Sequence, residues 1–321
     1  MSAPIDRSST WPYEDGRPGA FTYARFSSPT MAETERSLGA LDGGDALLFA
    51  SGSAACTSIL LALLAPGQTV AVAEGAYYGT GTILDELARW GIGKVEFDQT
   101  GPPPAGVDLV WLEAPSNPFL TTPNFEAAAA HPARVVCDST AATPLNVRPL
   151  AVGCDLVLHS ATKYLSGHDD ALAGVVVCKR AEDAARLLEF RSRTGPVPSA
   201  DTAWLVARGL KTLEVRMARQ TESARELARR LSDHAAVSAV RYPGFGGLLS
   251  FDVADAAAAQ RVETSTLLFV NATSLGGVTS RIESRARWEG SRVPPGLLRI
   301  SVGLEDPDEL WADLERALAR T

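Results

Sequence analysis

Between Asp45 and about Val177, short apolar runs alternate with amphipathic segments of helical length. The runs are too apolar for a sheet with one face in water, and the alternation is typical of parallel strands covered by helices on both faces. The sequence therefore predicts an α/β region with a mostly parallel central sheet flanked by helices. We expect strands at Ala46–Phe49, Thr69–Ala73, Lys94–Phe97, Asp108–Leu112, Arg134–Cys137, Asp155–Leu158 and Gly174–Val177, and helices at Ala54–Leu64 and Gly81–Trp90.

The pattern changes after about residue 200. Few helix breakers occur from Ala200 to about His234, which predicts one long helix, and a last helix at Asp306–Ala319 has Asp306 as its cap. Between them we expect strands at Val237–Tyr242, Gly247–Val253, Leu267–Val270 and Leu298–Val302. We predict an N-terminal arm over 1–35, a large domain over 36–207 and a smaller C-terminal α+β domain over 208–321.

Composition and charge exclude several classes of protein. The 321 residues include 30 basic and 38 acidic side chains, and the net charge of −8 gives no positive field for nucleic acid or anionic membranes. Residues 1–30 contain no apolar signal-peptide core, and no stretch approaches the ~18 apolar residues of a membrane span. We therefore expect a cytoplasmic protein that binds neither nucleic acid nor a membrane.

Cysteine and histidine are not spaced as metal ligands. The four cysteines are spread along the chain without a C-x-x-C pair, and three lie in apolar runs, where free cysteine behaves as a small apolar residue. His131, His159 and His168 also lack ligand spacing. We expect no disulfide and no metal site, and we interpret these histidines as structural.

One lysine has unusual neighbours. Lys163 follows an apolar run, and the nearby Ser160 and Thr162 carry hydroxyl groups that can donate to phosphate oxygens. A lysine in a partly desolvated pocket has a lowered pKa and can form a Schiff base with an aldehyde. Taken alone, a lysine in such a turn is most often a surface residue.

Two further features favour a phosphate-bearing cofactor. Gly52 opens the junction of a strand and an apolar helix, where backbone N–H groups bind anions. Asp138 ends an apolar strand, and the carboxyl ends of strands line the ligand crevice of α/β sheets. In isolation, a plain strand–helix connection and a helix N-cap explain these residues as well. Together with Lys163 they match pyridoxal phosphate (PLP), which needs phosphate donors, an acid for its pyridine nitrogen and a lysine for its aldehyde.

A series of motifs runs from about Tyr23 to Leu318. They are Tyr23-Ala-Arg25 with Ser28-Pro-Thr30, Ser51-Gly52, Tyr77-Tyr-Gly-Thr80, Glu113-Ala-Pro-Ser-Asn-Pro118, Ser160-Ala-Thr-Lys-Tyr-Leu-Ser-Gly-His168, Arg208-Gly-Leu-Lys-Thr-Leu213, Ser274-Leu-Gly-Gly277 and Leu298-Arg-Ile-Ser-Val-Gly-Leu-Glu-Asp306. In this order the chain resembles the Cys/Met-metabolism PLP enzymes, a family that includes cystathionine γ-synthase, cystathionine γ-lyase and methionine γ-lyase. The resemblance implies the fold-type I architecture, which is aspartate-aminotransferase-like, with PLP as cofactor and a small amino acid as substrate.

The resemblance implies a cofactor role for many of these residues. Lys163 looks like the lysine that bonds PLP and later moves protons, and Tyr77 would be the second catalytic residue, stacked on the ring. Asp138 would hold the pyridine nitrogen, and Asn117 would contact the phenolic oxygen. The residues that would bind the phosphate are Gly52, Ser53, Ser160 and Thr162, with Tyr23 and Arg25 of a neighbouring subunit.

A second set of residues would bind the substrate. The resemblance implies that Arg299 holds the α-carboxylate through two hydrogen bonds, a geometry that lysine cannot match. Ser274 would line the same end of the pocket. Glu113, which we group with these residues, would support Asn117 at the phenolic oxygen. Because Tyr23 and Arg25 would serve the neighbouring subunit, the resemblance implies a homo-oligomer with shared sites, either a dimer or a tetramer.

Some positions depart from the usual family motifs. Thr273 stands where members that handle cystathionine usually have a glutamate, and Gly79 where methionine γ-lyases often have a cysteine. Ser284-Arg285-Ala286-Arg287 stands in place of the usual His-Pro-Ala-Ser. Its two arginines either shape a pocket for an acidic substrate or lie on the surface.

The resemblance implies an enzyme that carries out β- or γ-elimination on sulfur-containing amino acids. We expect first a cystathionine γ-lyase-like reaction, which gives cysteine, 2-oxobutyrate and ammonia. The alternatives are γ-replacement, as in cystathionine γ-synthase or an O-acyl-homoserine sulfhydrylase, then a methionine γ-lyase, and more remotely a PLP-binding regulator without catalysis. Lyase and transferase share every residue named above, so the sequence leaves that choice and the substrate open.

Overall fold

The apolar runs of the first half form one sheet. Its strands are β1 (Asp45–Phe49), β2 (Thr69–Ala73), β3 (Gly93–Phe97), β4 (Leu109–Glu113), β5 (Arg134–Asp138), β6 (Leu156–His159) and β7 (Gly174–Cys178). In the computed structural model, which describes residues 4–320, they have the order β1-β7-β6-β5-β4-β2-β3. β2 to β6 are parallel, and β7 is antiparallel to both β6 and β1. The predicted mostly parallel sheet is confirmed.

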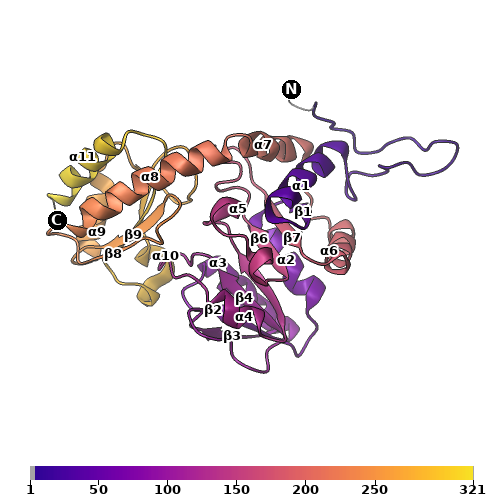
Figure 1. The fold of residues 1–321 in the computed structure, drawn as a ribbon, viewed down its shortest axis with the longest axis horizontal. Helices are drawn as coiled ribbons and strands as arrows, with labels where there is room; N and C mark the ends of the chain where they lie inside the picture. The colour runs from indigo at the N-terminus through magenta and orange to yellow at the C-terminus, as the bar shows by residue number, and fades with distance from the viewer. Residues whose placement is uncertain (1–3, 321) are drawn as a thin grey trace.

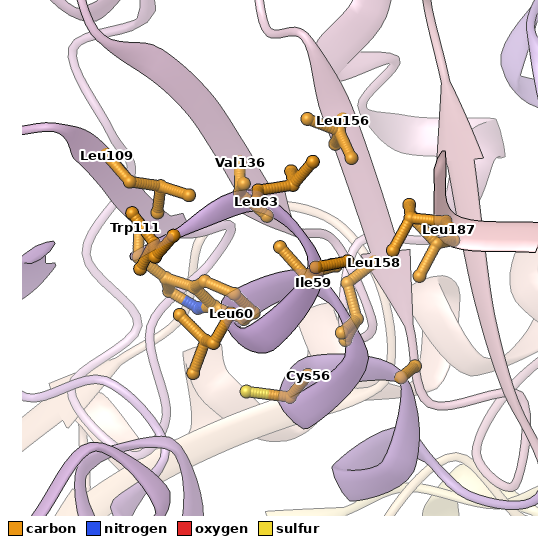
Figure 2. Close-up of a cluster of buried hydrophobic side chains, with 14 of the residues drawn as sticks. Cys56, Ile59, Leu60, Leu63, Leu109, Trp111, Val136, Leu156, Leu158 and Leu187 are labelled. Carbon is orange, nitrogen blue, oxygen red and sulfur yellow. The ribbon is translucent and has the colours of Figure 1, made fainter. Parts of the chain in front are cut away.

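Helices cover both faces of this sheet (Figure 1). Alternate residues of β6 enter opposite clusters: Leu156 and Leu158 pack with Ile59 and Leu187, as Figure 2 shows, while Val157 packs with Leu38 on the other face. Burial of both faces explains the uninterrupted apolar runs. The helices of this region are α1 (Pro29–Asp42), α2 (Gly52–Leu63), α3 (Tyr78–Leu87), α4 (Phe125–Ala129), α5 (Thr143–Asn146) and α6 (Ala181–Thr194), with 3₁₀ turns η1 (Ala88–Trp90) and η2 (Pro149–Val152).

The single long helix expected from residue 200 is wrong, because the chain forms two helices, α7 (Ala200–Leu210) and α8 (Leu213–Ser232). The buried Arg216 side chain donates to the carbonyls of Gly209 at 2.9 Å and Tyr164 at 2.8 Å. In a continuous helix the Gly209 carbonyl would accept the backbone N–H four residues later, and here the Arg216 side chain is one of its donors. A Cβ at Gly209 would lie 2.3 Å from the Ser166 carbonyl oxygen, so α7 approaches the loop after Lys163 very closely.

The second half forms a smaller sheet. Its strands are β8 (Ala239–Arg241), β9 (Leu248–Asp252), β10 (Val270–Asn271), β11 (Arg281–Ser284) and β12 (Leu297–Ser301). Among the described residues their order is β10-β11-β12-β9-β8, and β10 and β11 are its parallel pair. Apolar residues of α8, α9 (Ala256–Ser265) and α11 (Pro307–Leu318) pack on this sheet. The remaining elements are α10 (Ala286–Glu289) and η3 (Gly290–Arg292).

Two details of this region differ from the sequence prediction. The expected strand Leu267–Val270 is wrong at its first three residues, because their N–H groups donate to the Asp313 carboxylate rather than to a neighbouring strand. Strand β11 was not predicted. Its register places Glu283 opposite Arg299 of β12.

The predicted domain limits can be placed on these elements. Residues 29–35 of the predicted arm belong to α1, and the described residues before them, 4–28, include a loop that projects from the body (Figure 1). The limit at 207 and 208 lies in the last turns of α7. Met217 of α8 packs with the large sheet, whereas Leu227 packs with the small one, so α8 connects the two cores. Over residues 4–320, no helix has the length and apolarity needed to cross a membrane.

Candidate active site

A crevice of about 210 Å³ lies between the two sheets. One wall consists of residues at the carboxyl ends of β2, β4, β5 and β6, where α/β sheets bind ligands. The other wall comes from residues 273–275, 285 and 299 of the C-terminal part. The crevice brings together these predicted site residues: Gly52, Ser53, Tyr77, Glu113, Asn117, Asp138, Ser160, Thr162, Lys163, Ser274 and Arg299.

Lys163 lines the crevice from the turn after β6. Its Nζ donates to Oγ of Ser274 at 2.7 Å, so a residue of the C-terminal part orients the amine. Burial lowers the pKa of Lys163 to about 8, and the positive charges of Arg299 and Arg281 contribute to this shift. A larger fraction of the amine is therefore neutral near neutral pH than in a surface lysine, which suits a nucleophile or a base.

Asp138 ends β5 and is held by neutral groups. Its Oδ1 accepts from the backbone N–H of Thr140 at 3.0 Å and from the Thr140 hydroxyl, which in turn accepts the Ser160 N–H at 2.8 Å. Burial raises the pKa of Asp138, and a cation beside it would favour its charged form. The sequence reasoning missed Thr140, although a hydroxyl residue two positions after an aspartate is the signal of such a turn.

The start of α2 forms a cradle beside Ser160. Ser51 caps the helix by accepting from the Ala54 N–H at 3.0 Å. The N–H groups of Gly52 and Ser53 belong to the first turn, where backbone N–H groups have no acceptor within the helix. A Cβ at Gly52 would lie 2.9 Å from the Ser160 Cβ, so only glycine allows this approach. These groups make a site for an anion.

Thr162 differs from Ser160 in its hydrogen bonds. The Thr162 hydroxyl donates to the carbonyl of Ala173 at 3.1 Å and accepts the Ala173 N–H at 3.0 Å. Its single hydroxyl proton is therefore already used within the loop. Thr162 lines the crevice, but it must rotate before it can donate to a phosphate.

Tyr77 precedes α3 and depends on Glu113 for its position. The Tyr77 N–H donates to Oε2 of Glu113, and a Cβ at Gly79 would lie 2.4 Å from the Tyr77 ring. Burial raises the pKa of Tyr77 to about 12, so the phenol keeps its proton at neutral pH. Burial and then the charge of Asp138 raise the pKa of Glu113 well above its ordinary range. In this structure Glu113 supports the tyrosine.

Arg299 lies on β12 and is almost fully buried. Its Nη1 donates to Oδ1 of Asn117 at 3.0 Å, and its Nη2 donates to the Ser274 carbonyl and to Oε2 of Glu283, each at 2.9 Å. Burial, followed by the charge of Arg285, lowers the pKa of Arg299 to about 10, so it remains a cation at neutral pH. Because the Asn117 oxygen accepts from Arg299, the NH₂ group of Asn117 is not used in this bond, and Asn117 lines the crevice.

The two arginines of the unusual segment have different environments. Arg285 is buried and lines the crevice, which excludes the surface interpretation for this residue. Arg287 has a side chain that is 47% exposed, and it pairs with Glu263. The sequence left open whether these arginines line a pocket or lie on the surface, because no local pattern distinguishes the two.

Tyr23 and Arg25 do not line the crevice of their own chain. Both lie on the N-terminal arm, where Tyr23 is 41% exposed and Arg25 donates to the Ser192 carbonyl. The Arg25 guanidinium lies 5.1 Å from the centre of the Tyr23 ring. The crevice of one chain is thus lined by an anion cradle, a lysine and a buried arginine.

The family model described as Cys/Met metabolism PLP-dependent enzyme matches residues 1–319. The chain is 38% identical to a cystathionine gamma-synthase of Mycobacterium tuberculosis, covering 99% of this chain and 92% of the relative. It is 39% identical to an L-methionine gamma-lyase of Streptomyces avermitilis, covering 99% and 84%. A solved structure of cystathione gamma lyase (CalE6) from Micromonospora echinospora has a TM-score of 0.94 at 35% identity, with 99% and 93% of the chains covered. A cystathionine gamma synthase of Xanthomonas oryzae pv. oryzae, solved in complex with cystathionine, has a TM-score of 0.94 at 32% identity, with the same coverage.

Proposed function

We propose that this chain, which belongs to the Cys/Met metabolism PLP-dependent enzymes, carries out β- or γ-elimination on a sulfur-containing amino acid. The chain is an enzyme with the fold of that family, and its cofactor is pyridoxal phosphate. Cystathionine is the first substrate that we propose, with γ-elimination to cysteine, 2-oxobutyrate and ammonia.

The crevice residues fit this cofactor. The N–H groups of Gly52 and Ser53, with the Ser160 hydroxyl, would hold the phosphate. Asp138 would pair with the pyridine nitrogen, which would supply the cation that this buried carboxylate lacks. Lys163 would bond the cofactor covalently. When bound, pyridoxal phosphate supplies an electron sink for the charge left at Cα after deprotonation.

The observation that carries the proposal is the position of the Lys163 amine. Lys163 lines the same crevice as the cradle and Arg299, its Nζ donates to the Ser274 hydroxyl at 2.7 Å, and its pKa is about 8. Arg299 would bind the α-carboxylate and place the substrate Cα beside Nζ, which would take the proton and return it. Tyr77 would hold its own proton at the phenol oxygen for the acid step.

Among the described residues the crevice contains two arginines. Arg285 bonds only to the carboxylates of Glu283 and Glu289, whereas Arg299 also bonds to the neutral oxygens of Asn117 and Ser274, which a substrate carboxylate would displace at lower cost. We therefore assign Arg299 to the substrate α-carboxylate.

The test is a product assay on the PLP-loaded enzyme. With L-cystathionine alone we expect 2-oxobutyrate and cysteine in equal amounts. The same enzyme is then given an O-acyl-homoserine with and without a thiol. Formation of a thioether with negligible 2-oxobutyrate would contradict the lyase proposal and support γ-replacement. No turnover across cystathionine, methionine, cysteine, homocysteine and O-acyl-homoserines would favour the non-catalytic alternative.

We also propose a homo-oligomer in which Tyr23 and Arg25 complete the phosphate site of a neighbouring subunit. Their position on the extended arm, outside the crevice of their own chain, supports this arrangement.

A further inference from the structure

Arg285 is the second buried guanidinium of the crevice, and it is 1% exposed. Its Nη1 donates to Oε2 of Glu283 at 2.8 Å. Its Nε and Nη2 donate to Oε1 of Glu289 at 3.1 and 2.8 Å. All three nitrogens are therefore engaged, and its guanidinium carbon lies 5.9 Å from the centre of the Tyr78 ring. Arg285 is built into the protein rather than left open to a ligand.

Glu283 connects Arg285 to Arg299. The same oxygen, Oε2, accepts from Nη1 of Arg285 at 2.8 Å and from Nη2 of Arg299 at 2.9 Å. The other oxygen accepts from Nε1 of Trp288 at 2.6 Å. Both oxygens thus have partners, and the carboxylate is fixed between the two arginines.

Sharing this carboxylate changes what Arg299 offers to a substrate. With Glu283 as its sole ionic neighbour, Arg299 would form a neutral pair, and Glu283 would compete with a substrate carboxylate for the same guanidinium. Because Arg285 bonds to the same carboxylate, the negative charge of Glu283 is shared by two cations, and the Glu283 side chain is fixed in position. The charge of Arg285 is also the second cause, after burial, of the lowered pKa of Arg299, so the two groups interact electrostatically.

We propose that Arg285 is a positioning residue for Arg299. Through Glu283 it holds the Arg299 guanidinium in place, and by pairing with the same carboxylate it keeps Glu283 from compensating the full charge of Arg299. Arg299 can then bind the substrate α-carboxylate. This inference rests on the proposed carboxylate-binding role of Arg299.

The experiment compares two ligands of the PLP-loaded enzyme. Glycine lacks a leaving group, and methylamine is glycine without its carboxylate. Titration of the cofactor absorbance yields a Kd for each, and the ratio of methylamine Kd to glycine Kd measures what the carboxylate contributes. The variants are Arg285→Met and, as matched control, Arg287→Met, which removes an arginine of the same segment that bonds to Glu263 instead.

We expect the ratio to fall about tenfold in Arg285→Met, since one charge-assisted contact is worth roughly that factor. It should stay within about twofold in Arg287→Met. KM for the amino-acid substrate should rise in Arg285→Met while kcat changes little, because Arg285 does not touch the reacting atoms. An unchanged or higher ratio in Arg285→Met would overturn the proposal.

Arg299→Met separates this inference from its premise. If Arg299→Met lowers the ratio and Arg285→Met does not, Arg299 binds the carboxylate without help from Arg285, and only this inference fails. If Arg299→Met leaves the ratio unchanged, the role of Arg299 fails as well. Should Arg285→Met not fold, Arg285→Lys keeps the charge but loses the planar guanidinium that bonds both Glu283 and Glu289. We expect the ratio of methylamine Kd to glycine Kd to fall about threefold in this variant. No fall in Arg285→Lys would then count against the proposal.

Discussion

The two ends of the crevice hold their charged groups in different ways. At the end that we propose for the cofactor (the cofactor end), Asp138 is bonded to Thr140, and Lys163 to the hydroxyl of Ser274, so both groups have neutral hydrogen-bond partners. At the end that we propose for the substrate (the substrate end), Arg299 and Arg285 share Glu283 in ion pairs of 2.9 and 2.8 Å. Both ends are buried, so burial alone does not explain the difference.

The difference follows from how long each ligand stays. A buried charge is costly without a partner. Pyridoxal phosphate remains bound through turnover and can be the permanent partner of Asp138. A substrate leaves after every cycle, so an arginine that binds it needs a resident carboxylate as well. The cofactor end therefore relies on its ligand for charge balance, whereas the substrate end balances its own charges.

The largest effect should come from Lys163→Ala at the cofactor end. We expect activity to fall by at least about 10³-fold, because both the covalent link and the base are lost. Borohydride reduction followed by peptide mapping should no longer fix the cofactor to the chain. Lys179→Ala, an exposed lysine at the end of β7, is the matched control and should retain both properties. A Lys163→Ala protein with the same reducible chromophore would show that another residue bonds the cofactor.

A smaller effect is expected from Arg299→Met at the substrate end. KM should rise about 100-fold, the cost of removing one member of a buried charged contact. The Kd of the cofactor should change by no more than about threefold, because Glu283 keeps its bond to Arg285. KM is measured from initial rates, and the Kd of the cofactor by absorbance titration of the same preparation. An equal loss of both would mean that the two ends are one structural unit and that Arg299 has no separate role.

The smallest effect that we expect is on the pH dependence of cofactor capture by Lys163. A lysine must be neutral to attack the cofactor aldehyde, and the pKa of Lys163 is lowered from 10.5 to about 8. The rate at which cofactor-free protein captures pyridoxal phosphate should rise with pH and level off above about 8. Stopped-flow absorbance from pH 6 to 10 measures this. A rate that still rises in proportion to hydroxide at pH 10 would mean an ordinary lysine. Arg281→Met should move the midpoint upward, since the Arg281 charge contributes to the lowering.

The sequence predicted the cofactor end more completely than the substrate end. Lys163, Asp138 and Gly52 each follow or precede an apolar strand, so their place at the edge of a parallel sheet follows from local pattern. Glu283 was not predicted at all, since strand β11 has no clear pattern of its own and its pairing with β12 depends on residues far along the chain. The same reasoning explains why α7 and α8 were taken as one helix: the carbonyl bonds of Arg216 reach the loop after Lys163.

The sequence by itself determined the periodicity of the strands, the apolar faces that pack into a layered core and the order of the motifs around Lys163. These depend on neighbours within a few residues, which the chain carries in its local pattern. Only the tertiary structure decided that Arg285 is buried against Glu283 and Glu289 while Arg287 stays half-exposed. It also decided that Asp313 takes the N–H groups of residues 267–269. In each case a charge or a backbone group is satisfied by a partner that approaches only after the chain has folded, so its position depends on packing.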